Sequence, residues 1–117
     1  MGYVTRQPTI FGSVQPTAGE LQQLAVMELG QNAYGSVFVS NSSHTSSDRV
    51  RLAVKPLIDE ESPVSGKHYI LYDLYLDPSY SIQLANIGLD YGDRIYGYSL
   101  YGHVNFNMTG DLIINVP

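Results

Sequence analysis

Short runs of β-branched and aromatic residues, separated by Gly, Pro, Asn, Asp and Ser, recur about every 8–12 residues along most of the chain. The clearest run covers residues 49–55, where Val50, Leu52 and Val54 alternate with Arg49, Arg51, Ala53 and Lys55. Alternation of this kind is typical of a strand with one buried face. The pattern predicts an all-β fold of about eight short strands and no helix.

The expected strands cover residues 21–29, 33–40, 49–55, 68–76, 82–87, 94–99, 103–109 and 112–116. Residues 21–29 fit a helix as well as a buried strand, and the β-rich chain around them favours the strand. Gly110 and Asp111 are expected to form a turn between the last two strands. A length of 117 residues fits one domain, so we predict a single β-sandwich, jelly-roll-like, over residues 21–117.

Residues 1–20 are expected to form an extended N-terminal arm. Pro8, Gly12 and Pro16 lie at intervals that disfavour any long regular element. Ile10 and Phe11 are the arm's candidate contact residues. The arm either lies on its own domain or reaches a neighbouring subunit.

The composition disfavours several classes of function. The chain has 6 Lys and Arg against 11 Asp and Glu, a net charge of −5, so we expect no nucleic-acid binding. No apolar run approaches the roughly 18 residues of a membrane span, and the N-terminus lacks the apolar stretch of a signal peptide. The absence of Cys excludes disulfides, thiol catalysis and Cys-ligated zinc.

Candidate catalytic and metal sites are weak. His44, His68 and His103 lie in separate segments without the spacing of metal ligands, so we expect no metal or other cofactor. Asp90 and Asp93 belong to one turn, where Asp is common, and Asp77 precedes a proline. No nucleophile or phosphate-binding motif is present, and we expect the chain not to be an enzyme. A hydrolase acting through Asp93 is the least favoured alternative.

The turn at residues 90–93 has a structural explanation. Gly92 is expected to supply a positive φ, and Asp93 to accept hydrogen bonds from turn amides. Both residues are therefore predicted to define the fold and to perform no chemistry.

Tyrosine is abundant, with 10 residues, whereas Trp is absent. Tyr is a good strand former, and it is also enriched at protein interfaces. The candidate interface residues on the strands and bends are Tyr69, Tyr75, Tyr96, Tyr98 and Tyr101. A protein contact is favoured over carbohydrate binding because Trp, the strongest stacking residue, is missing.

About two-thirds of the chain resembles a family of small all-β virion structural proteins of tailed bacteriophages. The resemblance is carried by the stretches VFVSNSS (37–43), VRLAV (50–54), YILYDLYL (69–76), IGLDYGDRIYGYS (87–99) and VNFNMTG (104–110). The chain departs from the family pattern at Gly97, where a β-branched residue is more usual.

This resemblance implies a non-enzymatic virion protein that is assembled in the host cytoplasm. The expected role is that of a capsid decoration or cement protein. The expected partners are the major capsid protein or other virion proteins. The chain itself is expected to form a homo-oligomer, with a trimer favoured. A tail, neck or fibre-base component is the first alternative. A carbohydrate- or host-surface-binding β module is the second.

Overall fold

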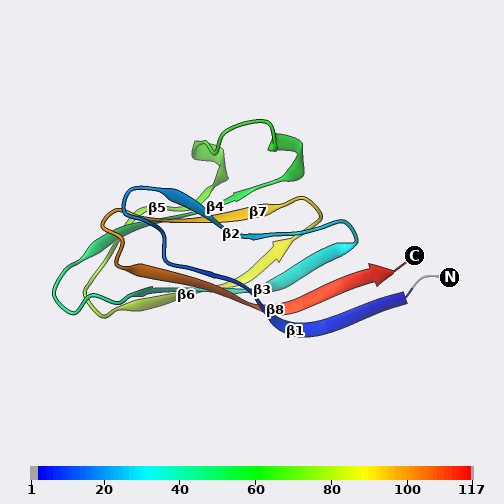
Figure 1. The fold of residues 1–117 in the computed structure, drawn as a ribbon, viewed down its shortest axis with the longest axis horizontal. Coiled ribbons are helices and arrows are strands. Elements are labelled where there is room, and N and C mark those ends of the chain that lie inside the picture. Colours follow the sequence, from blue (N-terminus) through cyan, green and yellow to red (C-terminus); the bar gives the residue numbers. More distant parts are fainter. Residues whose placement is uncertain (1–2, 117) are drawn as a thin grey trace.

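A computed structural model describes residues 3–116 of the chain as two packed antiparallel sheets (Figure 1). Sheet A has the strand order β1-β8-β3-β6 and sheet B the order β2-β7-β4-β5. The strands are β1 (Tyr3–Val14), β2 (Leu21–Val26), β3 (Gln31–Asn41), β4 (Asp48–Lys55), β5 (Tyr69–Leu76), β6 (Ser81–Leu89), β7 (Arg94–Ser99) and β8 (Val104–Val116).

The pairing follows a simple rule along the chain. β1 pairs with β8, β2 with β7, β3 with β6 and β4 with β5, each antiparallel. The chain is thus one long hairpin, wrapped so that its two halves alternate within each sheet. This is the strand order of an eight-stranded jelly roll. The predicted all-β sandwich is confirmed.

The tip of the long hairpin is the β4–β5 connection, residues 56–68. It contains two short 3₁₀ turns, η1 (Leu57–Asp59) and η2 (Gly66–His68), and stands above sheet B in Figure 1. The same view places the start of β1 and the end of β8 side by side, beyond the end of sheet B.

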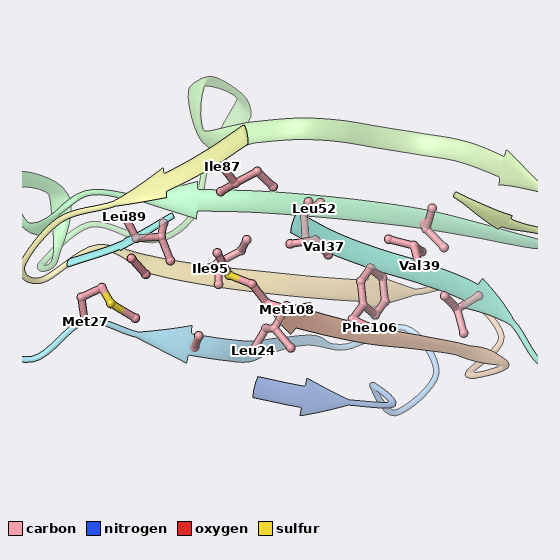
Figure 2. Close-up of a cluster of buried hydrophobic side chains, with 14 of the residues drawn as sticks. Leu24, Met27, Val37, Val39, Leu52, Ile87, Leu89, Ile95, Phe106 and Met108 are labelled. Carbon is pink, nitrogen blue, oxygen red and sulfur yellow. The ribbon is translucent and has the colours of Figure 1, made fainter. Parts of the chain in front are cut away.

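The core lies between the two sheets (Figure 2). Sheet B contributes Leu52 and Ile95, and sheet A contributes Val37, Phe106 and Met108, all fully buried. The inward positions of residues 50 and 52 and of 104, 106 and 108 are those that the period-two pattern predicts. Burial of these apolar side chains is the main source of stability.

The first 20 residues differ from the expectation, because a regular strand forms where none was predicted. β1 lies at an edge of sheet A, opposite β8. An edge strand tolerates Pro8, since only one side of its backbone is paired. Gly12 follows a register shift and approaches β2 so closely that a Cβ there would lie 1.8 Å from the carbonyl oxygen of Leu24. The proline and glycine that disfavour a strand in the sequence are accommodated by edge geometry.

The C-terminal end also differs from the expectation. Residues 104–116 form one strand, without a turn at Gly110 and Asp111. Gly110 lies opposite Gly35 in the β3–β8 register, so the missing side chains allow a close approach of two extended strands. The predicted number of strands is therefore right through two compensating errors: one strand was missed and another was divided.

Candidate interaction surface

The outer face of sheet B carries a row of stacked side chains from three strands. The guanidinium of Arg51 on β4 lies 4.3 Å from the ring centroid of Tyr72 on β5 and 4.5 Å from that of Tyr98 on β7. The Tyr72 ring in turn meets Tyr69 edge to face, with centroids 4.9 Å apart. We call Tyr98, Arg51, Tyr72 and Tyr69 the tyrosine–arginine ladder. Cation–π stacking and aromatic contacts hold these side chains in one arrangement.

The charge of the ladder is neutralised within the chain. Arg51 Nε donates to Asp73 Oδ1 over 2.6 Å. This hydrogen bond raises the pKa of Arg51 above its usual range although burial opposes the shift, and it lowers the pKa of Asp73. The two groups form an ion pair at neutral pH, and the surface presents mainly rings to a partner.

Irregularities in β5 place Tyr72 and Asp73 beside Arg51. The β4–β5 register shifts twice, between Val50 and Leu52 and again between Leu52 and Ala53. Asp73 has a φ of 52°, which is a left-handed conformation. Simple alternation along residues 68–76 would place Tyr69 and Tyr72 on opposite faces of the strand. The register shifts remove this alternation, and the two rings are in contact.

A surface pocket of about 570 Å³ adjoins one end of the ladder. Val64, Ser65 and Gly66 of the β4–β5 connection form one part of its lining, and Tyr69 and Tyr72 form another. The pocket therefore offers two phenol rings beside polar groups of a loop.

Four of the predicted interface residues lie on this outer face. Tyr69 and Tyr98 belong to the ladder, Tyr75 is paired with Arg49 on β4, and Tyr96 stacks near Lys55, whose Nζ is 5.8 Å from the ring centroid. Tyr75 is the most exposed of the four, at 59%.

The other three predicted interface residues lie elsewhere. Ile10 is exposed on β1 of sheet A, and Phe11 packs against the core. Tyr101 is exposed in the β7–β8 loop. The structure therefore gathers four of the seven on one surface, to which Arg51 and Tyr72 must be added. No local pattern identifies these two, because their neighbours come from strands far apart in the sequence.

The turn at residues 90–93 has the conformation that the sequence predicts. Gly92 has a φ of +81°, and a Cβ there would lie 2.6 Å from the side chain of Leu57. Asp93 Oδ2 accepts a hydrogen bond from the backbone N–H of Asp90 over 2.9 Å. These contacts are those of a structural turn.

One carboxylate–imidazole pair occurs in the β4–β5 connection. His68 is buried, its Nε2 lies 3.0 Å from Asp59 Oδ2, and its Nδ1 accepts from the backbone N–H of Ser65 over 2.9 Å. The amide donor on Nδ1 places the ring proton on Nε2, which donates to Asp59. This hydrogen bond from His68 lowers the pKa of Asp59. Since both ring nitrogens of His68 are hydrogen-bonded to groups of the β4–β5 connection, the His68–Asp59 pair stabilises that connection.

Within residues 3–116, no group of three or more His, Asp or Glu side chains lies close enough to hold a metal ion. The described residues also contain no helix long and apolar enough to cross a membrane.

Comparison with known proteins supports the fold. No protein-family model matches the chain, and neither does any curated protein. One solved structure with a similar fold is a chain of the T13 IBDV viral particle, described in the context of icosahedral virus evolution, with a TM-score of 0.52 and 7% identity. The match covers 98% of this chain and 31% of that one, so this chain spans about a third of the viral chain. At this identity the likeness shows the fold alone.

Proposed function

We propose that this chain is a non-enzymatic structural protein of a virion, which binds the particle through the outer face of sheet B. The observation that carries the proposal is the tyrosine–arginine ladder on a jelly-roll scaffold. Tyr and Arg, together with Trp, are the residue types enriched among those that dominate binding energy at protein interfaces. The ladder is already ordered in the single chain, so little conformational entropy is lost when a partner covers it.

The more specific role is decoration or cementing of a bacteriophage capsid, with the major capsid protein as partner. Two observations support it. The sequence stretches described above resemble small virion proteins of tailed bacteriophages, and a chain of an icosahedral viral particle has a similar fold. Weak single contacts, repeated by symmetry over a shell, add up to firm attachment. A tail, neck or fibre-base position would use the same surface.

The pocket beside the ladder favours one second candidate, carbohydrate binding. Tyr69 and Tyr72 line it together with Ser65 and a stretch of loop backbone. Sugar rings stack on aromatic side chains while hydroxyl groups take up the polar contacts. Glycan-array binding that Tyr72→Ala removes would support this candidate over a protein contact.

A matched pair of tyrosine variants tests the proposed surface. Tyr98→Ala removes a ladder ring, whereas Tyr34→Ala removes an exposed tyrosine of β3, on the other sheet. We expect Tyr98→Ala to weaken binding to particles that lack this chain by about tenfold or more. Tyr34→Ala should change binding by less than about twofold. Binding is measured by co-sedimentation with the particles, after thermal denaturation has shown that both variants are folded.

Equal losses in the two variants, or full binding by Tyr98→Ala, would contradict the assignment of the interface to the outer face of sheet B.

A further inference from the structure

One buried imidazole joins two parts of the β4–β5 connection. His68 is 5% exposed, and each of its ring nitrogens bonds to a different segment. Nε2 lies 3.0 Å from Asp59 Oδ2 in η1. Nδ1 accepts the backbone N–H of Ser65 over 2.9 Å, as one half of the capping box at the start of η2. The ring thus ties η1 to the segment that leads into η2.

The contact at Nδ1 exists only while the ring is neutral. A backbone N–H is always a donor, so Nδ1 must present its lone pair to Ser65. A protonated imidazole carries a hydrogen on both nitrogens and accepts no hydrogen bond. Imidazole is also the side chain that ordinarily gains this proton between about pH 8 and about pH 5. Acidification therefore sets two donors against each other, the Ser65 amide and the His68 ring.

The charged groups around the ring determine which of its two contacts is lost. Asp59 remains an acceptor for Nε2, because the hydrogen bond from His68 lowers the pKa of its carboxyl group. Lys67 of η2 places its Nζ 3.3 Å from the same carboxylate. Lys55 of β4, the strand against which η2 packs, donates to backbone carbonyls of the connection, and residues 60 and 61 are exposed glutamates. The protonated ring therefore stays with Asp59, and the contact with the Ser65 amide is the one that breaks.

We propose that His68 is a pH-sensitive switch in the wall of the pocket beside the tyrosine–arginine ladder. Ser65, whose amide the ring holds, lines that pocket together with Val64 and Gly66. When the ring gains its second proton, residues 64–66 are released from it, and this part of the pocket wall becomes mobile. The sandwich itself stays folded in this range, because the Asp48 carboxylate takes up its proton only below about pH 4.

His44, in the β3–β4 loop, makes a contact of a different kind. Its Nδ1 lies 2.8 Å from the Ser79 hydroxyl. A hydroxyl group both donates and accepts, so this contact persists when the His44 ring is protonated. His44 is therefore a matched control for proton uptake by a histidine. The switch is also independent of the virion role, since it operates in the isolated chain without any partner.

Hydrogen exchange of the Ser65 amide, followed by NMR, tests the proposal. After correction for the intrinsic pH dependence of exchange, its protection should fall about tenfold or more between about pH 7.5 and about pH 5. The amide of Gly19, bonded to the Ser99 carbonyl, should keep its protection and report that the sandwich is folded. His44→Gln should change neither result. Constant protection of Ser65, or an equal loss at Gly19, would overturn the proposal.

Two substitutions at residue 68 separate proton uptake from a general loss of structure. In His68→Asn the amide oxygen reaches the position of Nδ1 and accepts from Ser65 at every pH, so protection of the Ser65 amide should not depend on pH. In His68→Gln the amide nitrogen reaches the position of Nε2 and donates to Asp59, whereas Ser65 loses its acceptor. Protection of Ser65 should then be low already at about pH 7.5. A pH-dependent loss in His68→Asn equal to that of the wild type, or full protection in His68→Gln, would contradict the switch.

Discussion

Asp48→Ala is expected to lower the free energy of unfolding by about 3 kcal/mol or more. Asp48 is 1% exposed and is the first residue of β4. Its carboxylate accepts hydrogen bonds from the Ser99 hydroxyl (2.6 Å) and from the backbone N–H groups of Arg49, Tyr101 and His103 (2.7, 3.0 and 3.1 Å). Removal of the carboxylate leaves buried donors of the β7–β8 loop without their acceptor. Urea denaturation measures the loss.

Asp77→Ala is the matched control, because Asp77 is an exposed aspartate of the β5–β6 turn. It should change stability by less than about 0.5 kcal/mol. Comparable losses in the two variants would show that the buried network does not contribute as described.

The same carboxylate gives stability a defined pH dependence. Burial raises the pKa of Asp48, but the hydrogen bonds from Ser99, Tyr101, His103 and Arg49 outweigh it, so the pKa lies below its usual value. The unfolded chain therefore takes up this proton first, near pH 3.9. The stabilisation is fully present above that pH and is lost as pH falls through the folded pKa. The stability difference between wild type and Asp48→Asn should be constant above about pH 5 and shrink below about pH 4.

Gly97→Val is expected to destabilise the fold by about 3 kcal/mol or more. A Cβ at residue 97 would lie 2.9 Å from two ring carbons of Phe106, which is fully buried in the facing sheet. The valine side chain can be accommodated only if Phe106 or the sheet moves. Gly88→Val on β6 is the matched control, since a Cβ there meets only the Tyr34 ring, at 3.8 Å. Thermal denaturation compares the two.

A double variant tests the cause of that loss. The double variant Gly97→Ala, Phe106→Leu should lose less stability than the sum of the losses in the two single variants. The leucine side chain is smaller than the Phe106 ring and leaves space for the new Cβ at residue 97. If the losses of stability in the two single variants simply add, the Phe106 ring is not the reason why residue 97 must be glycine.

Gly97 also illustrates what local sequence patterns can show. Strand propensity places a β-branched residue there, and the sequence pattern of the resembled family does the same. The bounds of β7 were predicted correctly, and those of β4 to within one residue, because alternation reports a buried face directly. The partner that requires glycine, Phe106, comes from another sheet, and no spacing within residues 94–99 indicates it.

Strand β1 and the tyrosine–arginine ladder could not be predicted for the same reason, which is that both depend on the order of the strands in the sheets. β1 becomes a strand despite Pro8 because its place at the edge of sheet A leaves one backbone side free, and edge position is a property of the topology. The neighbours of Arg51 depend on bulges in β5 and on the register of β7. Tyr69 and Tyr98 could be predicted as interface candidates from composition, whereas the inclusion of Arg51 and Tyr72 required the strand order.

Cryo-electron microscopy of the virion tests the virion role most directly. The proposal predicts jelly-roll density of this chain at regular positions on the particle, with Tyr98, Arg51 and Tyr72 covered by another virion protein. Finished particles without this chain, or particles in which that face of sheet B is open to solvent, would contradict it.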